Sequence, residues 1–251
     1  MNKVTNLSLI MGGLLLIFGC QSAPVAEVSE VKPILIIPEV SPPERRLNAA
    51  FLIMDGVFNT ELTAPMDILQ HTVFHTEHGI NVFTIAENSD MVTTFEGLRI
   101  MPDYTFNHDS LPSIDILVVP SAEHHLDTDL ENKTMISWVK EIGEKASYVM
   151  SLCDGAFVLA TAGLLNNSEC TTFPGDIEKF KNTFPQLSVK EGISFVHDGK
   201  FITSAGGAKS FDPALYLTEM LYGKKAAMGV AGGLVIDWEI NNIDCIIVNN
   251  K

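Results

Sequence analysis

Apolar runs of strand length alternate with segments of helical periodicity along most of this chain. The short apolar runs that predict buried strands are residues 49–54, 80–86, 115–120 and 148–152. Helical spacing over residues 61–74 and 130–146 predicts helices between them, the first capped by Asn59 or Thr60. Strands that alternate with helices predict an α/β domain with a flavodoxin-like, doubly wound, mainly parallel sheet and helices on both faces.

The later part of the chain predicts more helices and one antiparallel pair. Residues 193–196 and 200–203 flank Asp198-Gly199, a dipeptide typical of a tight hairpin turn. A shorter hairpin arm is expected over residues 91–101. The remaining expected elements are helices over residues 176–184, 211–221 and 224–238 and an edge strand over residues 243–248.

The most informative stretch is residues 148–165, which predicts a strand, a sharp turn at Cys153 and then a helix. Gly155 follows the turn, where a side chain would crowd the backbone. A cysteine at such a turn lies at a helix N-terminus, where free amide groups and the helix dipole favour the thiolate. This is the arrangement of a nucleophile elbow, with sulfur in place of the serine oxygen. The alternative is that Cys153 is a small, buried core residue.

Ligands of doubly wound sheets bind beyond the carboxyl ends of the strands. That rule brings together Glu61, the loop of residues 121–125, Cys153 and the turn of residues 204–207. We therefore expect these residues to line one site.

The N-terminus carries an export signal that is separate from the folded domain. A short basic start and an apolar run over residues 7–18 end in Ile17-Phe-Gly-Cys20. The pattern predicts a signal peptide over residues 1–19, and its end resembles the bacterial lipobox, which implies a lipidated Cys20. Gln21 next to that cysteine resembles the sorting pattern for the outer membrane of a Gram-negative cell, facing the periplasm. The alternatives are an ordinary signal peptide or an uncleaved anchor.

Proline-rich composition sets the next segment apart from the domain. Residues 20–47 are expected to form an extended, semi-stiff tether, although the apolar residues 34–37 could pack on the domain. Residues 48–240 would form the folded domain, and residues 241–251 a C-terminal extension.

Charge and cysteine content narrow the partners and the compartment. The formal net charge is −15 and no basic stripe is present, which argues against nucleic acid and anionic lipid surfaces as partners. Besides Cys20, the cysteines are Cys153, Cys170 and Cys245, an odd number for an oxidising compartment. A Cys170–Cys245 disulfide would leave Cys153 free.

Four segments of the domain resemble the DJ-1/PfpI superfamily of class I glutamine-amidotransferase-like folds. The nearest branch resembles the isonitrile hydratases and the amidase-like domains of AraC-type regulators. The segments are residues 56–65, residues 115–120, residues 153–165, and residues 203–206 with the following Asp212. The resemblance extends over residues 47–238 and implies the same fold as the hydrophobic pattern.

The resemblance implies that Cys153 is the nucleophile and Glu61 its acidic partner. A carboxyl buried against a thiolate can stay protonated, donate a hydrogen bond to sulfur and act as a general acid or base. The backbone N–H of Asp154 and one from the Ser121–Ala122 loop would hold an oxyanion or an imidate-like nitrogen. The resemblance implies no cofactor and no metal.

Three positions depart from the family pattern. Ser121-Ala122 stands where Gly-Gly is frequent, and Phe173 stands where many members carry a histidine. Asp154 follows the nucleophile where threonine or histidine is frequent, and an inward-pointing carboxylate there would raise the pKa of the thiol.

The histidines offer two further hypotheses. His124 or His125 could supply the base that Phe173 does not, or the two could form a solvated loop pair. His71, His75 and His78 have a helical spacing that can bind a metal, but an exposed helix face explains the same spacing.

Three functions are compatible with this sequence. The first is a lipid-anchored, cysteine-dependent hydrolase, hydratase or lyase that acts on a small molecule such as an isonitrile, amide or aldehyde. The second is a catalytically degenerate envelope lipoprotein that binds a small molecule or senses oxidation through a sulfenic acid at Cys153. The third is a structural or chaperone-like partner that uses the fold's tendency to form homodimers.

Overall fold

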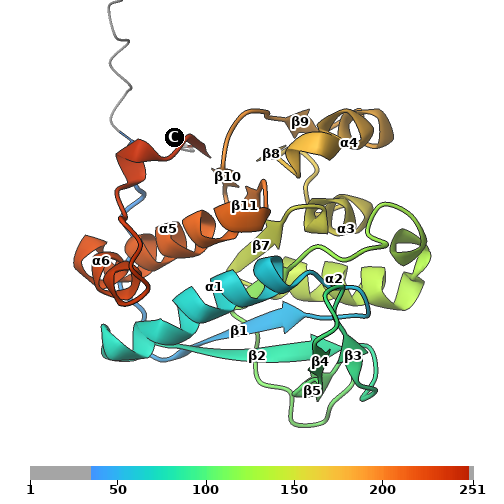
Figure 1. Ribbon diagram of the computed structural model, residues 1–251, viewed down its shortest axis with the longest axis horizontal. Helices are drawn as coiled ribbons and strands as arrows, with labels where there is room; N and C mark the ends of the chain where they lie inside the picture. The colour runs from blue at the N-terminus through green and yellow to red at the C-terminus, as the bar shows by residue number, and fades with distance from the viewer. Residues whose placement is uncertain (1–34, 249–251) are drawn as a thin grey trace, which may run out of the picture. The chain divides into compact units, whose positions relative to one another are not determined.

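The sheet in this computed structural model, which describes residues 35–248, is doubly wound and mainly parallel, as the sequence predicts (Figure 1). Eight strands follow the order β12-β10-β11-β7-β6-β1-β2-β5. Within this sheet, only β10 (Phe195–Asp198) and β11 (Phe201–Ser204) pair in antiparallel fashion, as the predicted hairpin. The other strands are β1 (Leu47–Leu52), β2 (Ile80–Ala86), β5 (Tyr104–Thr105), β6 (Ile116–Val119), β7 (Tyr148–Leu152) and β12 (Cys245–Val248).

Helices cover both faces of the sheet (Figure 1). The helices packed on one face are α1 (Asn59–His71), α5 (Phe211–Tyr222) and α6 (Lys224–Gly233). Those on the other face are α2 (Lys133–Lys145), α3 (Gly155–Thr161) and α4 (Ile177–Thr183).

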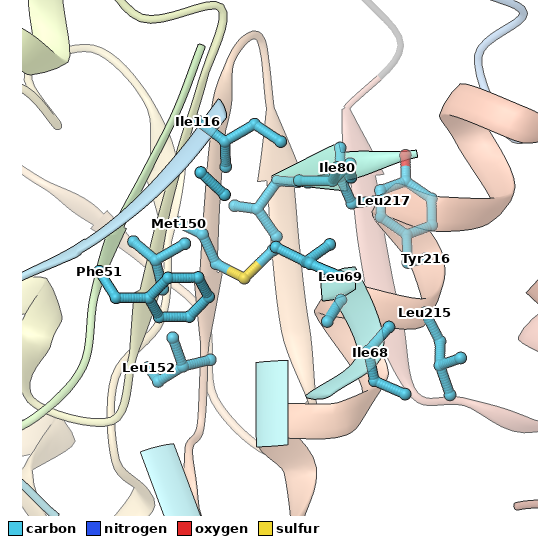
Figure 2. Close-up of a cluster of buried hydrophobic side chains, with 14 of the residues drawn as sticks. Phe51, Ile68, Leu69, Ile80, Ile116, Met150, Leu152, Leu215, Tyr216 and Leu217 are labelled. Carbon is cyan, nitrogen blue, oxygen red and sulfur yellow. The ribbon is translucent and has the colours of Figure 1, made fainter. Parts of the chain in front are cut away.

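Two hydrophobic cores result because successive strand residues point to opposite faces. Phe51 of β1 and Met150 of β7 pack with Ile68 and Leu69 of α1 in the first core, which Figure 2 shows. Leu52, the next residue of β1, belongs to the second core with α2 and α3. The central strands are therefore mostly apolar, and β6 is apolar at every position, which is why their pattern predicted burial on both faces.

The first helix begins two residues earlier than predicted and is capped differently. Its N-cap is Phe58, which makes no side-chain cap hydrogen bond. The Asn59 amide instead donates to Oε2 of Glu96 at 3.0 Å. Glu96 belongs to the predicted hairpin arm, β3 (Val92–Thr93) and β4 (Arg99–Ile100). The predicted cap by Asn59 or Thr60 was therefore wrong, since a carboxylate distant in sequence satisfies that helix end.

Three other helices are shorter than predicted, and α4 differs by only one residue at each end. Asn132 Oδ1 accepts from the Met135 amide at 3.0 Å and starts α2 at Lys133. The last helix, α6, ends at Gly233, and Trp238 instead donates its indole N–H to Glu219. The pattern missed two short strands, β8 (Glu169–Cys170) and β9 (Ser188–Val189). It also missed the 3₁₀ turns η1 (Thr72–Phe74), η2 (Thr128–Glu131), η3 (Pro174–Asp176), η4 (Gly207–Ser210) and η5 (Ile240–Asn242).

Both ends of the described chain join the domain. Leu35 and Ile37 pack against the first core, and the Leu35 amide donates to Asn241 Oδ1 at 3.1 Å. The predicted edge strand forms as β12, which pairs in parallel with β10. Within residues 35–248, no helix combines the length and apolar character needed to cross a membrane. The predicted signal peptide and Cys20 lie outside the described residues.

The expected disulfide is absent from the structure. Cys170 on β8 is buried, Cys245 lies on β12, and both are free thiols. Cys153 is also a free thiol, although Cys170 and Cys245 are not joined by a disulfide.

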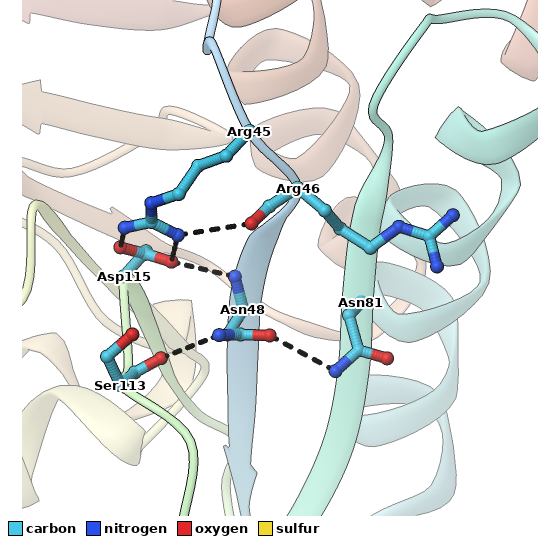
Figure 3. A network of polar contacts seen from close by, with 6 residues as sticks. All are labelled: Arg45, Arg46, Asn48, Asn81, Ser113 and Asp115. Atoms are coloured by element: carbon cyan, nitrogen blue, oxygen red, sulfur yellow. Dashed lines mark hydrogen bonds and ion pairs between the residues drawn. The ribbon is translucent and has the colours of Figure 1, made fainter.

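A polar network fixes the sheet at the amino ends of its central strands, opposite the predicted site (Figure 3). The Asp115 carboxylate accepts from two guanidinium nitrogens of Arg45, at 2.9 and 2.5 Å, and from the Asn48 amide at 2.9 Å. The Asn48 side chain donates to Ser113 O and accepts from Asn81. Since Asp115 is almost fully buried, these bonds satisfy a carboxylate that would otherwise oppose folding.

Candidate active site

The predicted elbow is present at Cys153. Its φ of 53° places a non-glycine residue in the left-handed region, between the end of β7 and the start of α3. Gly155 is required there because a Cβ at that position would lie 2.1 Å from Val119 O. The Cys153 amide donates to Ser204 O at 2.9 Å, which ties the elbow to the end of β11.

The turn of residues 204–207, at the end of the neighbouring strand β11, packs directly against Cys153. A Cβ at Gly206 would lie 2.3 Å from Cys153 Cβ, so only glycine allows this approach. The next amide, that of Gly207, donates to Glu61 Oε1 at 2.8 Å. Glu61 is 7% exposed and comes from α1. The structure therefore brings Glu61, Cys153 and the 204–207 turn together, as expected from the carboxyl-end rule.

The Asp154 side chain points into the same site. Cys153 Sγ donates to Asp154 Oδ2 over 3.7 Å. Asp154 Oδ1 accepts from the Thr172 hydroxyl at 3.0 Å, and the same hydroxyl lies 3.1 Å from Cys153 O. Asp154 is 7% exposed and Thr172 is buried. The thiol, the carboxyl and the hydroxyl thus form one connected hydrogen-bond network.

Sequence reasoning missed Thr172. It considered this segment only for the histidine that Phe173 replaces, and Phe173 itself is 43% exposed. The available signal was the Thr171-Thr172 pair, because small hydroxyl side chains often orient a neighbouring polar group.

The electrostatics of the elbow oppose a resting thiolate. Burial, and then the negative charges of Asp154 and Glu61, raise the pKa of Cys153 far above that of a free thiol. The Ser121 hydroxyl and the Asp154 amide lower this pKa, but they do not offset those effects. The amide at the helix terminus favours the thiolate as expected, but burial and the two carboxyls outweigh it, and the expected effect of an inward-pointing Asp154 is confirmed.

The Asp154 carboxyl has the properties of a base near neutral pH. Burial, with a contribution from the nearby negative charge of Asp176, raises its pKa to about 6. Above that pH the carboxylate can accept the proton that the Cys153 thiol already directs towards it.

The loop of residues 121–125 also lies near the elbow, but its groups differ in availability. The Ser121 hydroxyl is 1% exposed, influences the Cys153 thiol and has no hydrogen-bond partner among the described residues. The Ala122 amide donates to His125 Nδ1 at 3.2 Å, so it is already engaged. Within the loop that was predicted to supply one amide donor, the Ala122 amide is therefore not free to hold an oxyanion.

Neither loop histidine forms a hydrogen bond or ion pair with Cys153, Glu61 or Asp154. His125 is fully buried beside Met54, and burial lowers its pKa to about 3, so it is a neutral residue that holds the loop. His124 is exposed and lies 3.3 Å from Asp127. The geometry offers Asp154, rather than a histidine, as the proton acceptor nearest the thiol.

Of the three histidines predicted on the first helix, only His71 lies in α1, and they are not grouped for a metal. His71 Nδ1 lies 3.2 Å from Asp67 Oδ1, and His75 stands against Gly229. Across residues 35–248, no three side chains of histidine, cysteine, aspartate or glutamate are arranged to hold a metal ion.

Comparison with known proteins agrees with this geometry. The sequence model of the DJ-1/PfpI family matches residues 47–220. The chain is 28% identical to the isonitrile hydratase of Pseudomonas putida over 181 residues, which is 72% of this chain and 75% of that protein.

Solved structures share the same fold. The chain is similar to a ThiJ/PfpI family protein from Pseudomonas syringae, with a TM-score of 0.66, 24% identity and coverage of 77% of this chain and 76% of that one. It is also similar to an AraC family transcriptional regulator from Pseudomonas putida, with a TM-score of 0.64, 21% identity and coverage of 75% and 99%.

Substitution of Gly206 tests the contact between the turn and the cysteine. We expect Gly206→Ala to lower the free energy of unfolding by about 1–3 kcal/mol more than Gly207→Ala, because only the first adds a clash. Both glycines have positive φ, and a Cβ at Gly207 meets nothing within 4 Å. Denaturant unfolding of both variants measures the difference. Equal losses would contradict the contact.

The pKa of Asp154 predicts a pH-dependent stability. Because its pKa is raised from 3.8 to about 6, the folded state binds more protons than the unfolded state between these values, and stability falls as the pH rises through this window. Asp154→Asn cannot ionise, so it should match the wild type near pH 4 and exceed its free energy of unfolding by about 2–3 kcal/mol at pH 8. A difference that does not grow with pH in chemical denaturation would refute this assignment.

Proposed function

Because this chain belongs to the DJ-1/PfpI family, we propose that it is a cysteine-dependent hydratase or hydrolase of a small molecule. The observation that carries the proposal is the elbow, which holds the Cys153 thiol against two buried carboxyl groups, those of Glu61 and Asp154. The relationship to an isonitrile hydratase supports the addition of water as the reaction.

The first half of the reaction adds the thiol to the substrate, here an isonitrile R–N≡C. Asp154 accepts the thiol proton as Sγ forms a bond to the terminal carbon, so a preformed thiolate is not needed. Glu61 gives a proton to that carbon. The product is a thioimidate, R–N=CH–S, on Cys153.

The second half adds water and restores the enzyme. Water attacks the thioimidate carbon and gives a proton to Glu61, while Asp154 returns its proton to the substrate nitrogen. The carbon–sulfur bond then breaks and sulfur takes the hydroxyl proton. The formamide R–NH–CHO leaves, and both acids regain their starting protonation states.

One observation favours a second function. Burial and two neighbouring carboxyls hold Cys153 as a thiol, which suits a protein that binds a small molecule without turning it over. Oxidation sensing would also require Asp154 to accept the thiol proton, so that sulfur can attack a peroxide and form a sulfenic acid.

The cellular localisation of the protein is a further part of the proposal. The apolar run before Cys20 and the lipobox-like sequence support a lipid anchor at Cys20, with the domain in the periplasm at the outer membrane. A homodimer is compatible with the family's fold, and no nucleic acid partner is proposed for a chain of net charge −15.

Catalysis is tested with Cys153→Ser and Glu61→Gln. Each should lower the turnover of isonitriles, amides or aldehydes by at least about a hundredfold, because each removes a group that bonds to the substrate or transfers a proton. Cys245→Ser, a partly buried thiol on β12, is the matched control and should retain activity. Turnover that survives Cys153→Ser would exclude the first function. Peroxide modification of Cys153 without turnover of any substrate would favour the second.

The anchor is tested by fractionation and mass spectrometry. The wild type should be found in the membrane fraction, with a lipid on an N-terminal Cys20. Cys20→Ser should lose the lipid and the membrane association. An N-terminal peptide that starts at Gln21 or later in the wild type would refute lipidation.

A further inference from the structure

Three carboxyl groups gather at the elbow from three different elements. Asp154 follows the cysteine, Glu61 comes from α1, and Asp176 comes from η3. The charges of Asp154 and Glu61 both act on Cys153, and the charge of Asp176 acts on Asp154. Because Glu61 holds a proton at the start of the proposed reaction, the negative charge near the resting thiol comes from Asp154 and Asp176.

The basic side chains of residues 35–248 do not balance these carboxyls. None of their lysines, arginines or histidines forms an ion pair with Glu61, Asp154 or Asp176. The lysine nearest the turn in sequence, Lys209, pairs with Asp212 at 3.6 Å. The hydrogen bond to Glu61 Oε1 comes from a neutral amide. The hydrogen bonds to Glu61 and Asp154 come from neutral donors, so they do not compensate the charge of these carboxyls.

An unpartnered hydroxyl indicates that a ligand completes the site. Buried hydroxyls in folded proteins nearly always have a hydrogen-bond partner. The Ser121 hydroxyl is 1% exposed and has no hydrogen-bond partner of normal geometry within the described part of the chain, although it is close enough to the Cys153 thiol to lower the pKa of that thiol. A substrate atom at Sγ would supply the missing partner.

We propose that this site selects small molecules that carry a positive charge and rejects those that carry a carboxylate or phosphate. A cationic group would provide the counter-charge that the protein lacks, whereas an anion would lose its hydration next to charges of the same sign. This inference rests on the proposed function only for the location of the substrate. At separations of about 6 Å and an effective dielectric constant near 20, each carboxylate would change the preference by about tenfold or more.

The charge preference is measured on the full-length chain with two thiol reagents of matched size. One methanethiosulfonate carries a trimethylammonium group and the other a sulfonate group. The rate of modification at Cys153 alone is followed by mass spectrometry of its peptide at pH 8. The same two reagents are reacted with 2-mercaptoethanol, a small uncharged thiol, as the reference. The cation-to-anion rate ratio at Cys153 should exceed the ratio for 2-mercaptoethanol by at least about tenfold. A ratio equal to that of 2-mercaptoethanol would overturn the proposal.

Variants show whether the elbow carboxyls cause the preference. Asp154→Asn and Asp176→Asn should each lower the ratio severalfold, and either variant suffices if the other does not fold. Glu141→Gln removes the same charge from an exposed position on α2, where it pairs with Lys145, and should leave the ratio unchanged. An equal fall in all three variants would show that net charge alone is responsible and would overturn the proposal. The reagents react without turnover, so this result is independent of whether a substrate is found.

Discussion

The contact between the Gly206 turn and Cys153 is the constraint on which the site depends. It allows the end of β11 to meet the end of β7 with no side chain between them. The same turn presents the Gly207 amide to Glu61, so one backbone segment fixes both the cysteine and its acid. The positive φ of Cys153 is tolerated because these neighbours hold it from several sides.

The site combines a nucleophile position with an unfavourable setting for a thiolate. A buried thiol between two carboxyls remains protonated, and a buried aspartate next to it is ready to accept that proton. Activation would therefore occur during bond formation and not in the resting protein. In the proposed reaction, this division of roles would give the aspartate that follows Cys153 the function of a proton acceptor.

Much of the fold could be predicted because it is recorded in local patterns. Strand β2 has the bounds predicted from its apolar run, and the elbow was recognised from Cys153 and Gly155. Two of the missed features depend on contacts between distant segments. Glu96 caps α1 from a hairpin arm, and Thr172 reaches Asp154 from beyond β8. The hydrophobic periodicity of one segment carries no information about which side chains of a distant segment will contact it.

The bond between Ala122 and His125 has a consequence for how charge would be stabilised during a reaction. Since that amide is engaged, the loop's remaining side-chain donor near sulfur is the Ser121 hydroxyl. An amide is fixed in one direction by the backbone, whereas a hydroxyl rotates about its C–O bond. The Ser121 hydroxyl would therefore be less preorganised than a backbone amide. It could, however, turn to follow the linear carbon–nitrogen group of an isonitrile as that group bends during the reaction.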